Sequence, residues 1–202
     1  MRRSELVRAL ARVPSFPHPD PSREQLATPP ELAADLLWDA LQAGDIAGRS
    51  VLDLGCGTGR LAIGAAILGA DPVTGVDADA EAIELGRRAA REAGVGVAWE
   101  VRPVGAGEGP VDTVVMNPPF GAQRAHADRP FWEEALRRGR RVHAFALAAS
   151  RTFIAREAVA RRGRIDATRP VDWRLPATFP HHRRRAVTLA VDRWIVSGPR
   201  ER

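Results

Sequence analysis

Residues 115–121, Val-Met-Asn-Pro-Pro-Phe-Gly, place a side-chain amide, two prolines and an aromatic ring directly after an apolar run. The apolar residues 111–116 predict a buried strand, and the prolines end it because they cannot donate to a strand ladder. We therefore expect a rigid turn at the end of that strand. There the Asn117 oxygen and the Pro118 carbonyl can accept hydrogen bonds from a planar, amine-bearing ring that stacks on Phe120. This stretch predicts a site for the chemistry of a ring amine.

A second stretch, residues 51–59, reads Val-Leu-Asp-Leu-Gly-Cys-Gly-Thr-Gly and predicts a strand that enters a glycine loop. In an open parallel sheet, ligands bind beyond the carboxyl ends of the strands. A dinucleotide fingerprint requires glycine at position 60, where this chain has Arg60, and a P-loop requires a lysine, which the chain lacks. Asp53 precedes the glycines and either orders the loop or binds a ligand ammonium. Asp77 ends the next predicted strand and is placed to accept hydrogen bonds from both hydroxyls of a ribose.

Hydrophobic periodicity predicts the elements that position these groups. The expected strands are residues 50–54, 73–76, 97–101, 111–116, 142–147, 164–173 and 186–196, and the main expected helices are 29–43, 60–68, 80–93, 130–138 and 152–162. The first of these helices has Thr28 as its expected cap, with proline and Glu31 in the capping-box positions. Alternating strands and helices predict an α/β fold with a mainly parallel sheet, closed by an antiparallel hairpin.

Length, composition and charge restrict the class of protein. The chain has 202 residues, 45% of them hydrophobic, which predicts one domain: residues 1–48 form N-terminal helices and a capping segment, and residues 49–202 form the sheet core. No apolar run approaches the ~20 residues of a membrane span. One cysteine excludes an intramolecular disulfide and favours the reducing cytoplasm.

The charge is divided unevenly along the chain. Residues 1–128 hold 12 arginines against 18 acidic residues, a net charge of −6, whereas residues 129–202 hold 18 arginines against 7 acidic residues, a net charge of +11. All 30 basic residues are arginine. Such an asymmetry predicts that a polyanion binds one side of the molecule.

Two motifs carry a resemblance to a known superfamily. VLDLGCGTGRLAIGAAILGA followed by VTGVDAD resembles the first two motifs of class I S-adenosylmethionine-dependent methyltransferases, and NPPF resembles the fourth motif of those that methylate exocyclic or amide nitrogens. A closer resemblance covers nearly the whole chain. EQLAT at residues 24–28, NPPFG, Asp128 with Phe131, and LPATFPHHRRRAVTLAVD are similar to the methyltransferase-like protein 5 family of archaeal and eukaryotic rRNA adenine-N6 methyltransferases.

The resemblance implies a Rossmann-like class I methyltransferase with a seven-stranded sheet, helices on both faces, and S-adenosyl-L-methionine as cofactor. It also implies structured RNA as substrate, rRNA or a ribosomal subunit, and a small zinc-binding activator protein that adds to a sheet edge to form a heterodimer. The expected edge is the strand at residues 97–101, which contains Trp99. No metal site is expected in the chain itself, and no membrane partner.

The resemblance assigns roles to individual positions. Cofactor-binding residues would be Gln25, Thr28, Asp53, Gly55, Gly57, Thr58, Gly59, Arg60, Asp77, Ala78 and Asn117; catalytic residues would be Asn117, Pro118, Pro119 and Phe120; RNA-binding residues would be His182, Arg183, Arg184 and Arg185. One position departs from the family. Its usual acid after the third strand, which contacts the cofactor adenine, aligns with Arg102, and arginine cannot accept a hydrogen bond.

The implied chemistry explains why an amide is needed. An adenine amine is a poor nucleophile because its lone pair is delocalised into the ring. Acceptors aimed at its two hydrogens free that lone pair, and they bond more tightly as positive charge builds on nitrogen. Asn117 is neutral and is not expected to act as a base, so the proton leaves to water after the methyl transfer. The base must be unpaired or flipped out to reach the turn.

Three alternatives remain open at this point. The NPPF motif also serves guanine-N2 transfer on RNA and glutamine-N5 transfer on protein. A non-catalytic RNA-binding scaffold with a methyltransferase fold is the alternative from another class, and the Arg102 departure favours it slightly.

Overall fold

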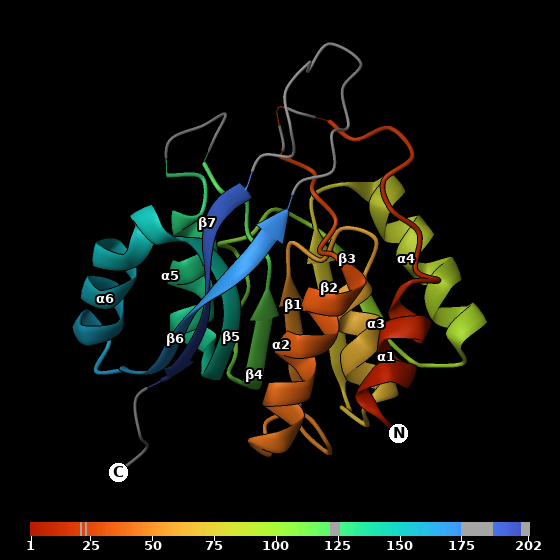
Figure 1. Cartoon of the computed structure of the whole chain (residues 1–202), viewed down its shortest axis with the longest axis horizontal. Coiled ribbons are helices and arrows are strands. Elements are labelled where there is room, and N and C mark those ends of the chain that lie inside the picture. The colour runs from red at the N-terminus through yellow and green to blue at the C-terminus, as the bar shows by residue number, and fades with distance from the viewer. Residues whose placement is uncertain (21, 23, 122–125, 175–187, 199–202) are drawn as a thin grey trace.

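The structure is a computed structural model that describes residues 1–20, 22, 24–121, 126–174 and 188–198 (Figure 1). Among these residues, seven strands form one sheet in the order β3-β2-β1-β4-β5-β7-β6. The strands are β1 (Val51–Leu54), β2 (Val73–Asp77), β3 (Ala98–Val101), β4 (Val111–Met116), β5 (Gly139–Leu147), β6 (Arg164–Arg174) and β7 (Thr188–Ser197). Strands β3, β2, β1, β4 and β5 are parallel, and β7 runs antiparallel to both β5 and β6. The expected α/β sheet with an antiparallel closing hairpin is confirmed.

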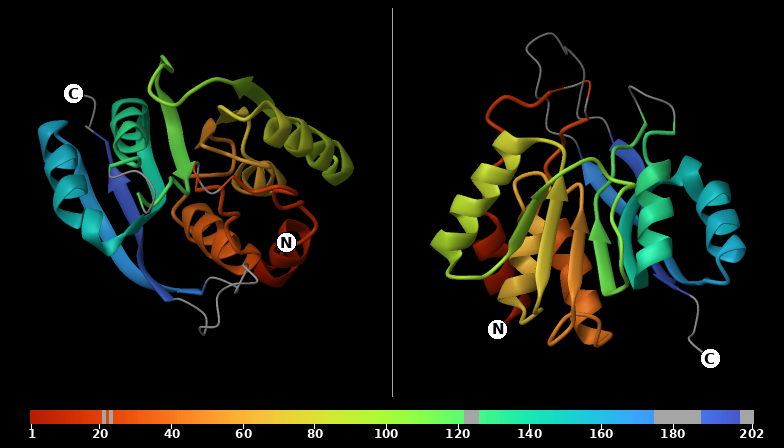
Figure 2. Two further views of the ribbon diagram at one scale, coloured as in Figure 1. Left: turned by 90° about the horizontal axis from the view of Figure 1, so that it is seen from above. Right: turned by 180° about the vertical axis from the view of Figure 1, so that it is seen from behind.

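Helices cover both faces of the sheet (Figure 2). They are α1 (Arg3–Leu10), α2 (Pro30–Gln42), α3 (Arg60–Ile67), α4 (Ala80–Ala93), α5 (Arg129–Arg138) and α6 (Arg151–Ala160), with a 3-10 turn, η2 (Ala148–Ser150), before α6. Helices α1 to α4 lie on one face, and α5 and α6 on the other. Because side chains alternate along a strand, Val51 of β1 packs in the α1–α3 core while Leu52 packs in the core under α5 and α6.

No helix among the described residues combines the length and the apolar character needed to cross a lipid bilayer.

The start of α2 differs from the sequence prediction. Pro29, not Thr28, is the cap residue, and it makes no side-chain capping bond, so the capping-box prediction was wrong. The physical reason is a competing contact: the Arg60 guanidinium donates to the Thr28 carbonyl (2.5 Å) and holds this residue outside the helix. Thr28 is thereby available to the site rather than to α2.

Trp99 anchors the edge strand β3 against the glycine loop. Its ring packs on three glycines, at positions 59, 75 and 86, and a Cβ atom at Gly75 or Gly86 would lie 2.9 or 2.8 Å from the ring. Gly59 also has φ +84°, a conformation that favours glycine. The last glycine of the loop thus serves the packing of β3 on the loop.

Candidate functional site

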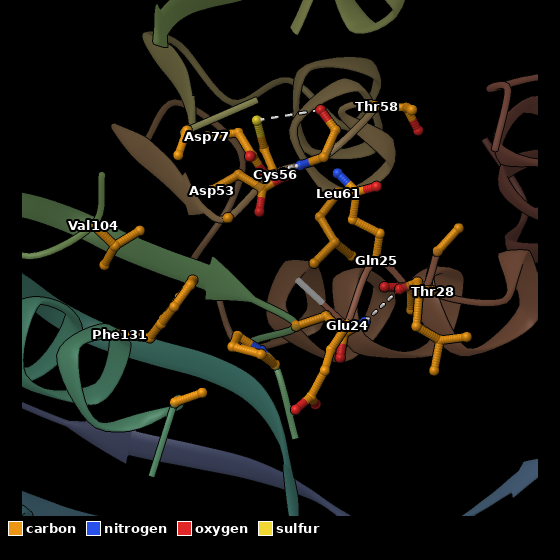
Figure 3. Close-up of a pocket in the computed structure, with 18 of the residues that line it drawn as sticks. Glu24, Gln25, Thr28, Asp53, Cys56, Thr58, Leu61, Asp77, Val104 and Phe131 are labelled. Carbon is orange, nitrogen blue, oxygen red and sulfur yellow. Dashed lines mark hydrogen bonds between the residues drawn. The ribbon is translucent and has the colours of Figure 1, made fainter. Parts of the chain in front are cut away.

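A cavity of about 720 Å³ opens at the carboxyl ends of β1, β2 and β4 (Figure 3). This is the edge at which an open α/β sheet binds ligands. Eleven of the predicted site residues line it: Gln25, Thr28, Asp53, Gly55, Gly57, Thr58, Arg60, Asp77, Ala78, Asn117 and Pro119. Residues from the N-terminal segment, the glycine loop and the amide turn therefore meet in one cavity, although up to 94 positions separate them in the chain.

Aromatic rings close over two of the loop glycines. Gly55 has φ +69°, and a Cβ atom there would lie 2.6 Å from the Phe131 ring; Gly57 has φ +52°, and a Cβ atom there would lie 2.7 Å from the Phe16 ring. A side chain at either position would be strained and would collide with the cavity wall. The glycines let the loop backbone approach both the rings and any ligand between them.

Asp53 lies at the base of the cavity and is 1% exposed. The backbone N–H of Ala62, in the first turn of α3, donates to its Oδ2 (2.9 Å), while its Oδ1 is buried without a hydrogen-bond partner. Burial raises the pKa of Asp53 to about 8. One oxygen therefore orders the start of α3 and the other is available to a ligand cation, so both roles expected of Asp53 fit the geometry.

Asp77 lies at the end of β2, half-buried on the cavity wall. The backbone N–H of Gly57 donates to its Oδ2 (2.8 Å) and that of Asp79 donates to its Oδ1 (2.9 Å). Burial raises the pKa of this carboxyl group. These two bonds fix the carboxylate and tie it to the glycine loop, and each oxygen retains a lone pair for a ribose hydroxyl.

The described residues of the N-terminal segment, 13–20, 22 and 24–28, which we call the strap, lie along the cavity and are fixed by hydrogen bonds to its rim. Arg60 reaches both of its ends, donating to the Val13 carbonyl (2.7 Å) and to the Thr28 carbonyl. Thr58 Oγ1 donates to the Pro14 carbonyl (2.6 Å), and Gln25 Nε2 donates to Asp79 Oδ2 (2.6 Å). The Arg60 guanidinium thus serves to hold the strap in place.

The strap also sets the orientation of the Asn117 amide. Asn117 Nδ2 donates to the Leu26 carbonyl (3.3 Å), and its Oδ1 is buried without a hydrogen-bond partner. A carbonyl can only accept, so this contact requires the NH₂ group to face Leu26 and leaves the oxygen as the free acceptor. The backbone N–H of Gly121 donates to Glu24 Oε2 (2.9 Å), a second contact between the strap and the turn.

The other residues of the turn occupy different surroundings. Pro119 lies on the cavity wall, Pro118 is buried behind it, and half-buried Phe120 is outside the set of residues that line the cavity. The Phe120 ring meets Trp173 of β6 edge-to-face, with centroids 5.3 Å apart. In this arrangement Phe120 packs on the core beside the turn.

Arg102 lies beside the cavity but does not line it. Its guanidinium donates to Glu100 (2.8 Å) and to Glu134 (3.2 Å), and the residues that reach the cavity after β3 are Pro103 and Val104. The arginine side chain is thereby occupied by carboxylates. The cavity wall at this point is therefore formed by Pro103 and Val104.

The predicted RNA-binding residues His182, Arg183, Arg184 and Arg185 lie outside the described residues. Within the described ranges, no group of three or more histidine, cysteine or acidic side chains is arranged to hold a metal ion. Sequence reasoning missed Phe16, Leu26 and Arg129 on the cavity wall. Phe16 and Leu26 lie in or beside an irregular proline-rich segment that gives no periodic signal.

The sheet, the glycine loop and the acid at the end of β2 define a Rossmann-like methyltransferase that uses S-adenosyl-L-methionine. The family model "Methyltransferase small domain" matches residues 29–143. A solved structure from Pyrococcus horikoshii, described as a candidate RNA methyltransferase, superimposes with a TM-score of 0.90 at 35% identity, over 99% of each chain.

Two curated relatives identify the family more narrowly. The chain is 32% identical to the rRNA N(6)-adenosine-methyltransferase Mettl5 of Drosophila melanogaster, over 94% of this chain and 93% of that one. It is 30% identical to the corresponding enzyme of Danio rerio, over 95% of this chain and 97% of that one. The chain belongs to this family of methyltransferases.

The residues present fit the cofactor of that family. The orphaned Oδ1 of Asp53 matches the ammonium of a methionine moiety, and the fixed carboxylate of Asp77 matches a ribose. The positive-φ glycines between them carry no side chain, so the backbone of the loop is open to a ligand beside the Phe16 and Phe131 rings. We therefore propose that the methyl donor binds in the part of the cavity formed by β1 and β2.

We predict that cofactor affinity decreases as the pH falls from about 7.5 to about 6, by up to ~tenfold per pH unit. In the free protein, burial raises the pKa of Asp53 to about 8, so the carboxyl group is protonated over this range. A bound ammonium lowers the pKa, and binding then releases a proton. Calorimetry in buffers of different ionisation enthalpy measures both quantities. Asp53→Asn is expected to bind more weakly and with a smaller pH dependence, since Asp77, whose pKa burial also raises, remains in the cavity. An Asn variant with the full pH dependence of wild type would contradict the assignment.

Proposed function

We propose that this protein transfers a methyl group from S-adenosyl-L-methionine to N6 of an unpaired or flipped-out adenine in small-subunit ribosomal RNA. Two relatives that align with this chain over nearly their whole length are named rRNA N(6)-adenosine-methyltransferase. The observation that carries the proposal is the buried, unpartnered Oδ1 of Asn117 on the wall of the cofactor cavity. A buried acceptor without a donor is costly unless a ligand supplies one.

Each group near the turn has a separate task in this reaction. Bound S-adenosyl-L-methionine supplies an electrophilic methyl group. Asn117 Oδ1 accepts a hydrogen bond from the adenine amine, and the Pro118 carbonyl accepts the second hydrogen. Positioning of the amine in line with the methyl group supplies much of the remaining acceleration. After the transfer, the methylated amine carries a positive charge and is acidic. It therefore releases its proton to water, and no charged base is needed.

The test is a methylation assay with labelled cofactor and deproteinised small-subunit rRNA, followed by digestion to nucleosides. We expect the label in N6-methyladenosine. Label in N2-methylguanosine, or in protein when whole ribosomal subunits are used, would instead support the guanine-N2 or glutamine-N5 alternative. RNA binding without any cofactor binding in a thermal-shift assay would support the scaffold.

We also propose that the chain forms a heterodimer with a small zinc-binding activator protein through the edge strand β3. This strand ends the sheet, and three of its four residues are exposed. Val101, at the end of this strand, is 54% exposed although its side chain is apolar. A partner strand that pairs with β3 would cover both the edge and this side chain.

A cytoplasmic location is consistent with the one, buried cysteine.

We predict that Val101→Glu weakens recovery of such a partner at least ~tenfold, the effect of ~1.4 kcal/mol of lost binding. The measurement is co-purification of the co-expressed zinc-binding protein with the tagged chain. Val159→Glu, on α6, is the matched control because Val159 is also an exposed large apolar residue, at 74%. Equal recovery with both variants, or a lone chain that is fully stable and active, would refute this interface.

A further inference from the structure

Arg129 and Phe153 meet at the lip of the cavity. Arg129 begins α5 and lines the cavity, and its guanidinium carbon lies 5.0 Å from the centroid of the Phe153 ring in α6. The starts of the two helices are joined beside this pair, because Ser150 Oγ donates to buried Asp128 Oδ2 (2.7 Å). The contact therefore rests on two helices that are fixed to one another.

The charge of Arg129 is not compensated within the described part of the chain. No carboxylate of those residues lies within ion-pair distance of its guanidinium. Arg151, two residues before Phe153 on α6, is different: its Nε and Nη2 both donate to buried Asp192, at 2.6 and 2.7 Å. Arg129 thus presents an exposed cation over the Phe153 ring, and its guanidinium makes no hydrogen bond to any residue that the structure describes.

Arg129 lies on the side of the cavity where the substrate would bind, not on the side of the methyl donor. Asp77, the ribose acid, ends β2, on one side of β1. The Asn117 turn ends β4 on the other side of β1, and α6 follows β5, the next strand along. Arg129 leans toward α6, so its guanidinium borders the half of the cavity that lies farther from the donor.

We propose that Arg129, stacked on Phe153, is a phosphate-binding site for the RNA backbone next to the target adenosine. The inference rests on the proposed function, since it takes RNA as the substrate. An arginine fork matches the oxygens of a phosphate in a bidentate manner. Stacking on a ring keeps the fork oriented, so less conformational freedom is lost when the phosphate binds. A phosphate held there positions the nucleotide without reading its base.

The experiment measures binding of a fluorescein-labelled RNA hairpin, with an unpaired adenosine in its loop, over a series of salt concentrations. For Arg129→Met we expect an affinity loss of about tenfold at low salt, and a decrease of about one in the slope of log affinity against log salt. Arg8→Met is the matched control, because Arg8 is an exposed helical arginine on the opposite face of the sheet. It should stay within about twofold of wild type.

A second variant separates the stack from the charge. Phe153→Leu keeps Arg129 and therefore the salt slope, but lowers affinity about threefold because the fork is no longer oriented. Both variants should unfold at the same temperature as wild type, and this control excludes general misfolding. Arg129→Met with the affinity and salt slope of wild type overturns the proposal.

Failure of this inference can be told apart from failure of the proposed function. If wild type produces N6-methyladenosine in rRNA and Arg129→Met binds the hairpin as wild type does, only the phosphate site is wrong. If wild type methylates no adenine while Arg129→Met loses affinity and salt slope, the phosphate site stands and the reaction is wrong.

Discussion

The Asn117→Ala variant is expected to turn over at least ~10²-fold more slowly than wild type, the usual effect of losing a group that stabilises a transition state. The Asn117 oxygen is a buried acceptor without a protein donor, fixed by the bond from Nδ2 to the Leu26 carbonyl. Alanine removes the acceptor but leaves Asp53 and Asp77 unchanged, so cofactor affinity should stay within about threefold. Single-turnover kinetics at saturating RNA, with calorimetry for the cofactor, measure the two effects separately.

Asn117→Asp provides the companion measurement. It retains an oxygen toward the cavity but replaces the NH₂ group, so that two acceptors would face each other where the Leu26 carbonyl now accepts a hydrogen bond. We expect this variant to be impaired as well, despite the small change in shape. Wild-type turnover in the alanine variant would show that the amide takes no part in the reaction.

Asp77→Ala is expected to weaken cofactor binding at least ~30-fold, since hydrogen bonds to a charged acceptor contribute about 1.5–3 kcal/mol each. The variant loses the ribose contacts and also releases the glycine loop, because Asp77 accepts the backbone N–H of Gly57. Calorimetric titration with S-adenosyl-L-methionine measures the loss.

Glu92→Ala is the matched control for the loss of cofactor affinity expected in Asp77→Ala. Glu92 is an exposed acid on α4, away from the cavity, and its removal changes the net charge equally. Its cofactor affinity should equal that of wild type. An Asp77→Ala variant that binds the cofactor as tightly as the control would remove the ribose assignment.

Much of this fold follows from local signals. Alternating apolar runs and glycine stops predict the parallel sheet, and the helix at Ala80–Ala93 with Gly94 after it has the bounds that were expected. The capping box at Thr28 failed because a contact from Arg60, 32 positions later, takes the Thr28 carbonyl. Local capping preferences cannot include such a tertiary competitor.

Some features of the site could be predicted from the sequence, and others depend on tertiary contacts. Glycines, strand-end acids and the Asn-Pro-Pro turn carry motif signals, and the structure brings them into one cavity. The Leu26 carbonyl that orients Asn117 could not be predicted, because a backbone carbonyl carries no residue-type signal. The Arg129–Phe153 stack likewise joins two helices whose separation in the chain conceals their contact. The sequence predicted that Gly59 belongs to a ligand-binding loop. In the structure this glycine is also needed for packing, because a side chain there would collide with the Trp99 ring.

The most direct test of the central claim is a crystal structure of the protein with S-adenosylhomocysteine and an RNA that carries its target adenosine. Our account predicts adenine N6 within ~2.7–3.2 Å of Asn117 Oδ1, with the sulfur of the cofactor product on the Asp53 and Asp77 side of the cavity. An adenine whose N6 points away from Asn117, or an Asn117 oxygen that bonds a protein donor in the complex, would contradict it.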